Sequence, residues 1–180
     1  MNLPNKLTIF RVCLIPFFLI SFFFQAQIPC GKWIALAIFV IASLTDLADG
    51  KIARKYNLVT DFGKFMDPLA DKLLTCSAMI ALIEFDRIPA WVVIVIIARE
   101  FTISGFRLVA ADNGKVIAAS MWGKVKTTFQ MIMVIVLIAN LGTDWVYYLE
   151  QFLIYASLIL TVVSLIDYLV KNKDVLSSEK

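Results

Sequence analysis

Long apolar runs separated by short charged clusters constrain the fold of this chain more than any other feature. Residues 12–31 include no charged side chain. A helix of about 20 residues, rising 1.5 Å per residue, crosses the roughly 30 Å apolar core of a bilayer. Hydrophobic residues make up 61% of the 180 residues, compared with about 45–50% in soluble domains. We therefore expect these runs to lie in lipid.

Five further runs predict helices of similar length. The second run starts after Lys32 and continues toward Asp46, and the third covers 65–83. The fourth starts after Pro89 and passes Arg99. The fifth covers 125–141 and the sixth covers 147–170. No small-residue cleavage pattern follows Phe24, so the first run is predicted to be an uncleaved span. The sequence predicts one all-α integral membrane domain over 1–180. We expect this domain to have six transmembrane helices, a short interfacial N-terminal segment at 1–6 and a short cytoplasmic tail at 171–180.

The distribution of Lys and Arg predicts the orientation in the membrane. When the six spans are threaded back and forth, only Lys32 and Arg87 of the 17 basic residues fall on the side opposite the N-terminus. Cytoplasmic loops carry the excess of Lys and Arg. Both termini are therefore predicted to be cytoplasmic, in a multi-pass protein of the cell (plasma) membrane.

Composition excludes several classes of function. The chain has no histidine, so any general base must be a carboxylate, a lysine or water. Cys13, Cys30 and Cys76 are widely spaced and form no CxxC pair, which indicates neither a disulfide framework nor a zinc site. A net charge of only +3 gives no reason to expect a nucleic-acid partner.

Four aspartates lie where apolar residues would be expected. Asp46 and Asp49 extend the second run, and Asp67 and Asp71 begin the third. An Asp at the bilayer centre costs roughly 2.5–3.5 kcal/mol on insertion scales. Spacings of three and four residues place each pair on one helix face. Intramembrane acids of this kind point to a functional site.

The depth of these pairs suggests a metal site. Counted from the far ends of their helices, both pairs lie about 20 Å deep, so four negative charges converge unless cations hold them. Oxygen ligands favour Mg²⁺ or Mn²⁺, and four carboxylates suit two ions. The alternative is a set of ion pairs at the membrane edge with Lys51, Arg54, Lys64 and Lys72.

Small residues beside the first pair suggest a nucleotide. Gly50 and Ala53 lie on nearly the same helix face, and glycine inside a helix is justified where a ligand approaches the backbone. Arg54 offers a planar fork that suits phosphate oxygens.

These residues form the pattern Asp46-x2-Asp49-Gly50-x2-Ala53-Arg54-x8-Gly63-x3-Asp67-x3-Asp71. The pattern resembles, at all eight positions, the motif of the CDP-alcohol phosphatidyltransferase family. Flanking residues resemble the bacterial members that transfer to glycerol 3-phosphate: Pro4-Asn5-x-Leu7-Thr8-x2-Arg11, Arg99-Glu100, Arg107, and Gly123-Lys124-x-Lys126-Thr127. The likeness is highly specific only within 46–71.

The resemblance implies a six-helix fold, usually dimeric, with a polar cavity facing the cytoplasm. It implies that Asp46, Asp49, Asp67 and Asp71 bind the metals, and that Asp71 also takes the proton of the acceptor. CDP-diacylglycerol would contact Asn5, Thr8, Asp49, Gly50, Ala53, Arg54 and Gly63. Asp61 lies outside the motif and is expected to be a loop or cap residue.

The acceptor is indicated by basic residues in the later spans. Arg99, Arg107, Lys124 and Lys126 form a cationic group that suits an acceptor with its own phosphate. Glycerol 3-phosphate or inositol phosphate fits better than serine, and only the resemblance favours glycerol 3-phosphate. Phosphatidylglycerol is another acceptor of the family. Lys124 and Lys126 could instead be membrane anchors, and Arg99 could pair structurally with Glu100 or with an Asp that faces its helix. A cation-coupled transporter fits less well, because no internal repeat is visible.

Overall fold

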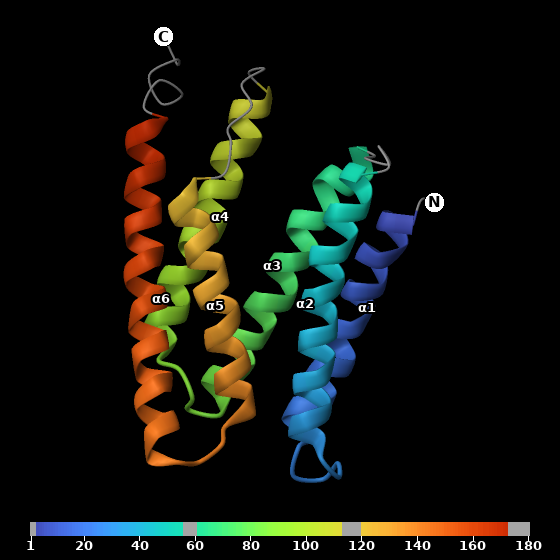
Figure 1. Ribbon diagram of the computed structural model, residues 1–180, viewed down its shortest axis with the longest axis vertical. Helices are drawn as coiled ribbons and strands as arrows, with labels where there is room; N and C mark the ends of the chain where they lie inside the picture. The colour runs from blue at the N-terminus through green and yellow to red at the C-terminus, as the bar shows by residue number, and fades with distance from the viewer. Residues whose placement is uncertain (1–2, 56–60, 113–119, 173–180) are drawn as a thin grey trace. The chain divides into compact units, whose positions relative to one another are not determined.

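The computed structural model describes the backbone of residues 3–55, 61–112 and 120–172, and in this part of the chain it contains six α-helices and no strand (Figure 1). Side chains of residues 3–4, 46–55, 61–65, 67–68 and 111–112 lie outside the description. The helices are α1 (Leu3–Phe23), α2 (Gly31–Lys55), α3 (Asp61–Glu84), α4 (Ala90–Asp112), α5 (Met121–Ala139) and α6 (Asp144–Lys171). The predicted all-α fold with six helices is confirmed.

The first helix differs from the predicted run at both ends. It begins at Leu3, so residues 3–6 are its first turn, and it ends eight residues before Gly31 because the chain turns ahead of α2. Cys30 has a φ of 58°, a left-handed conformation that a helix cannot continue. The predicted start of the first helix was wrong because the helix includes Lys6 and Arg11, which precede the run of uncharged residues.

Polar residues also extend the ends of later helices. The fifth helix begins at Met121 rather than at 125. Ser120 supports this start, because the backbone N–H of Gly123 donates to its Oγ at 3.1 Å, as an N-cap does. The third helix begins at Asp61, which is therefore the terminal helical residue rather than a loop residue.

Three helices are long and apolar enough to cross a membrane by the properties of their described residues: 5–23 of α1, 121–139 of α5 and 144–171 of α6. The other three have 25, 24 and 23 residues. These lengths exceed the roughly 20 residues that a span needs. They carry more charged residues, and the apolar part of α2 is Gly31–Thr45.

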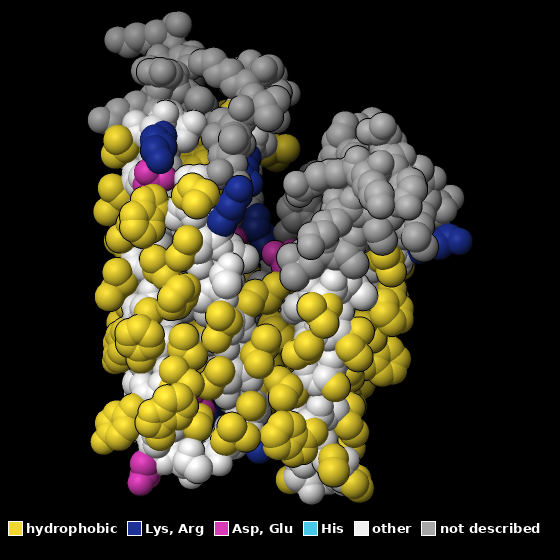
Figure 2. Space-filling model, in the orientation of Figure 1, with side chains coloured by type: hydrophobic (Ala, Val, Ile, Leu, Met, Phe, Trp, Pro, Cys, Tyr) yellow, Lys and Arg dark blue, Asp and Glu magenta, His cyan; other side chains and the backbone are white. Residues whose placement is uncertain are grey.

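Many large apolar side chains lie on the surface. Phe17, Ile94, Phe152 and Trp145 are between 61% and 72% exposed, and Figure 2 shows apolar side chains over most of the described surface on the face that it draws. Soluble monomers rarely expose apolar patches on this scale. Together with the apolar helices, this surface identifies a membrane protein.

The chain divides into two compact units. The N-terminal unit comprises Met1–Arg87 and Val134–Asn140, and in it α1 packs on both α2 and α3. Its core is partly aromatic: the Phe18 ring centroid lies 6.0 Å from that of Phe39, and the Phe22 centroid 4.9 Å from that of Phe85. Nζ of Lys32 donates to the backbone carbonyl of Asn140 at 3.2 Å, which joins the end of α5 to the start of α2.

The C-terminal unit comprises Ile88–Met133 and Leu141–Lys180, and in it α4 packs on α6. The buried face of α6 is unusually polar, with Glu150, Ser157, Thr161 and Ser164 beside apolar residues. Polar side chains bond across helices where lipid offers no partner. This unit therefore offers buried hydrogen-bonding groups along a membrane helix.

Candidate functional site: a carboxylate region and a charge cluster

The aromatic contacts of the N-terminal unit fix the levels of its helices. Phe18 of α1 contacts Phe39 of α2, so these two residues are level. Because α1 and α2 are antiparallel, seven residues back along α1 and seven residues forward along α2 reach a common level, which places position 11 level with position 46. Phe22 contacts Phe85, just beyond the end of α3, and α3 runs parallel to α1. In parallel helices both counts run in the same direction, so fourteen residues back from Phe22 and from Phe85 place position 8 of α1 level with position 71 of α3.

The backbone positions of Asp46 and Asp71 therefore lie within about one helical turn of the same level. Asp46 lies 15 residues after the start of α2, and Asp71 lies 13 residues before the end of α3. We call the stretches of α2 and α3 that carry the four motif aspartates the carboxylate region. Two helices of one unit thus present acidic positions at a shared depth.

Asp71 is the one motif aspartate whose side chain the structure describes. It is half-buried, and its backbone carbonyl accepts a hydrogen bond from Thr75 Oγ1 at 3.0 Å. No group of three His, Cys, Asp or Glu suited to a metal occurs among the described side chains. The predicted ligands Asp46, Asp49 and Asp67, and the predicted nucleotide contacts Gly50, Ala53, Arg54 and Gly63, have side chains outside the description.

One face of α1 carries polar residues near these levels. Asn5 is 7% exposed, and Thr8 and Arg11 are fully buried. They continue the stripe of Ile15, Phe18 and Phe22 that packs inside the unit. Asn5 and Thr8 were predicted contacts of the nucleotide. Arg11 was not a predicted site residue, although a lone charge in a run of apolar residues is a usable signal.

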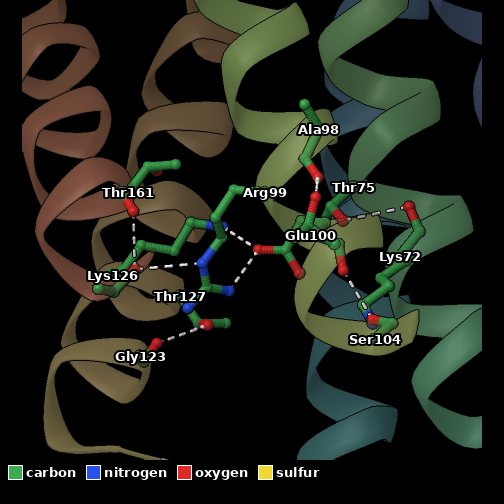
Figure 3. Close-up of polar contacts among 12 residues, drawn as sticks. Lys72, Thr75, Ala98, Arg99, Glu100, Ser104, Gly123, Lys126, Thr127 and Thr161 are labelled. Atoms are coloured by element: carbon green, nitrogen blue, oxygen red, sulfur yellow. Dashed lines mark hydrogen bonds and ion pairs between the residues drawn. The ribbon is translucent and has the colours of Figure 1, made fainter. Parts of the chain in front are cut away.

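The C-terminal unit contains the second polar group, which we call the charge cluster. It comprises Arg99, Glu100 and Lys126 (Figure 3) together with Ser164, which accepts a hydrogen bond from Arg99. Glu100 Oε1 accepts from Arg99 Nη1 at 2.9 Å and forms an ion pair with Lys126 Nζ. The side chains of Arg99, Glu100 and Lys126 are only 9%, 14% and 1% exposed. Buried charges persist where they are paired.

The structure brings two of the four predicted acceptor-binding residues into this cluster and leaves two outside it. Arg99 and Lys126 meet at Glu100, whereas Lys124 and Arg107 are exposed. The Arg107 guanidinium lies 5.9 Å from the ring centroid of Tyr168. Sequence reasoning considered Glu100 only as a structural partner of Arg99, and Ser164 had no signal beyond being polar in an apolar helix.

Comparisons with known proteins identify the family of the chain. Residues 1–163 match the family model described as CDP-alcohol phosphatidyltransferase. A Bacillus subtilis protein named CDP-diacylglycerol–glycerol-3-phosphate 3-phosphatidyltransferase is 46% identical over 189 aligned positions, covering 98% of each chain. Proteins with the same name from Haemophilus influenzae and Rickettsia felis are 43% and 38% identical over 93% of this chain, and 91% and 93% of their own lengths are covered. The chain belongs to the CDP-alcohol phosphatidyltransferase family.

Proposed function

We propose that this protein transfers the phosphatidyl group of CDP-diacylglycerol to glycerol 3-phosphate, which gives phosphatidylglycerophosphate and CMP. The observation that carries the proposal is the complete eight-position motif on α2 and α3, whose aspartate positions 46 and 71 share one level. Relatives that align over nearly the whole chain are named for this reaction.

The donor set of the carboxylate region fits divalent metal ions. Four carboxylates on two neighbouring helices supply only oxygen ligands, which Mg²⁺ and Mn²⁺ prefer. We assign Asp46, Asp49, Asp67 and Asp71 as ligands of two such ions. When bound, these ions would neutralise negative charge on the diphosphate of the substrate.

The reaction is a direct displacement at phosphorus. A hydroxyl oxygen of the acceptor forms a bond to the phosphorus that carries diacylglycerol, and the bond from that phosphorus to the CMP oxygen breaks. Asp71 accepts the hydroxyl proton as the new bond forms. One displacement inverts the configuration at phosphorus. Retention would indicate a phosphatidyl-enzyme intermediate and contradict this scheme.

The charge cluster accounts for an acceptor that carries a phosphate. Arg99 and Lys126 bring two positive charges against the single negative charge of Glu100, so these three groups carry a net charge of +1. Guanidinium and ammonium groups bind phosphate by charge-assisted hydrogen bonds. We assign Arg99 and Lys126 as the principal phosphate contacts, with Arg107 and Lys124 as outer contacts.

The lipid substrate indicates where in the cell the reaction takes place. CDP-diacylglycerol is a lipid, so the enzyme works within a membrane, which we propose to be the plasma membrane. The excess of basic residues on the predicted inner side favours an active site that faces the cytoplasm. We further propose a homodimer, as is usual in the family.

The test is to measure CMP release by the purified protein with CDP-diacylglycerol and Mg²⁺. Separate reactions receive glycerol 3-phosphate, inositol phosphate, phosphatidylglycerol or serine. We expect glycerol 3-phosphate to give the highest kcat/KM. A higher value with another acceptor would overturn the acceptor alone, whereas no CMP with any acceptor from folded protein would overturn the enzyme assignment. Asp67→Asn should abolish CMP release without changing membrane insertion.

A further inference from the structure

Glu100 lies outside the family motif, yet it holds the centre of the charge cluster. One of its oxygens, Oε1, contacts cations from two helices: Arg99 of α4 and Lys126 of α5 (Figure 3). Lys126 lies 26 residues after Glu100 in the sequence. Glu100 therefore ties together two positive side chains that would otherwise repel each other.

Arg99 is fixed from a second side by α6. Its Nε donates to Ser164 Oγ at 3.1 Å, and the Ser164 hydroxyl donates in turn to the carbonyl of Thr161 at 2.9 Å. Because the serine proton is committed to Thr161, the serine oxygen is left to accept from Arg99. Two of the three guanidinium nitrogens are thereby held by Ser164 and Glu100.

The third nitrogen, Nη2, has no hydrogen bond within the described residues. It lies beside the first turn of α5, because a Cβ added to Gly123 would be 3.5 Å from it. Glycine itself places no side chain against this nitrogen, and Ser120 Oγ is the other group near the same point. A buried arginine with two nitrogens held, and with the donors of the third unused by the described residues, is arranged to bind an additional acceptor group.

We propose that Glu100 is a positioning residue for the acceptor phosphate. It sets the spacing of Arg99 and Lys126 and keeps Nη2 of Arg99 directed at Gly123, where a phosphate oxygen can accept from it. Donors held in place before binding lose less conformational entropy when the ligand arrives. This inference rests on the proposed function and deepens it. The rival explanation is that Glu100 only joins α4 to α5.

Two variants separate these explanations. Glu100→Gln keeps an oxygen that can accept from Arg99 but removes the charge that holds Lys126. Glu100→Asp keeps the negative charge but shortens the side chain by one methylene, so its carboxylate cannot contact both cations at the original spacing. A purely structural role predicts that a loss in either variant follows the unfolding midpoint and affects both substrates, whereas a positioning role predicts a loss that is selective for glycerol 3-phosphate.

The experiment measures three quantities for each variant. They are the KM for glycerol 3-phosphate and for CDP-diacylglycerol, the equilibrium binding of labelled glycerol 3-phosphate in detergent, and the thermal unfolding midpoint. For Glu100→Gln we expect the KM and the Kd for glycerol 3-phosphate to rise about tenfold, as for the loss of one charge-assisted hydrogen bond. The KM for CDP-diacylglycerol should stay within twofold of the wild-type value.

Glu100→Asp should keep an unfolding midpoint closer to the wild-type value than Glu100→Gln does, while its KM and Kd for glycerol 3-phosphate rise severalfold. Equal rises of the KM for both substrates in Glu100→Gln, or changes below twofold in its KM and Kd for glycerol 3-phosphate, would overturn the positioning role while the proposed function stands. A wild-type protein that neither binds glycerol 3-phosphate nor releases CMP with it would overturn the proposed acceptor, and the positioning role with it.

Discussion

Replacing Lys126 by methionine should destabilise the protein far more than the same change at Lys124. The Lys126 side chain is 1% exposed and paired with Glu100, whereas Lys124 is exposed two residues earlier on the same helix. Methionine preserves most of the apolar stem in both cases, so the comparison isolates the buried ammonium group.

The structure sets the size of the effect. Removing one partner of a buried ion pair typically costs about 3–5 kcal/mol, because the other charge is left uncompensated. Here Glu100 keeps Arg99 as a partner at 2.9 Å, so the loss is nearer that of one hydrogen bond to a charged group, about 1.5–3 kcal/mol. For a chain of this length that corresponds to a fall in Tm of roughly 3–12 °C. Lys124→Met should stay within about 0.5 kcal/mol of the wild type.

The assay is thermal unfolding of both purified variants in the same detergent, followed by circular dichroism. The folded fraction at low temperature is checked by size-exclusion chromatography, so that aggregation is not mistaken for a low Tm. Equal Tm values for the two variants would refute the reasoning, because the buried pair would then contribute no more than an exposed charge. A larger fall for Lys124→Met would refute it as well.

Three further predictions use other parts of the chain. Asp71→Asn should lower kcat by at least about a hundredfold, as expected for loss of a general base. Asp86 is exposed beyond the end of α3, so Asp86→Asn should leave CMP release unchanged. Equal losses in the two variants would argue against a role of Asp71 in the chemistry. Gly31→Ala should destabilise the protein by about 1–3 kcal/mol, because the added Cβ would lie 2.7 Å from Gln25 Cα. Its control, Gly105→Ala, has nothing within 4 Å of the added Cβ and should be neutral or stabilise the helix by up to about 1 kcal/mol. Unfolding midpoints that rank the other way would contradict the packing around Gly31. Removal of divalent ions with EDTA should stop CMP release, and added Mg²⁺ or Mn²⁺ should restore it; activity that persists in EDTA would argue against bound metal.

The sequence predicted the number and type of the elements because membrane helices are recorded in long apolar runs. It predicted their ends poorly, since a charge-free run is not the same as a helix. Lys6 and Arg11 are both helical in α1, and the burial of Arg11 depends on neighbouring elements that a local pattern does not contain.

The pairing of residues within the charge cluster was only partly predictable: the sequence offered Glu100 as a partner of Arg99 but gave no sign of its contact with Lys126. Spacing along α4 and α5 indicated a cationic group, and Arg99 and Lys126 do lie together. The partner that joins them, Glu100, and the exposure of Arg107 and Lys124 depend on which faces of α4, α5 and α6 meet. Helix rotation of this kind is decided by packing, so the sequence alone could not separate the two pairs of basic residues.

Binding of Mn²⁺, measured by electron paramagnetic resonance on the purified protein, tests the central claim most directly. If the carboxylates of α2 and α3 hold a pair of metal ions, the wild type should bind two Mn²⁺ per chain. Their spectrum should show spin coupling, as expected for ions about 3.5–4 Å apart, and Asp67→Asn should lose that coupling. A folded wild type that binds no Mn²⁺, or a spectrum that is unchanged by Asp67→Asn, would contradict the account.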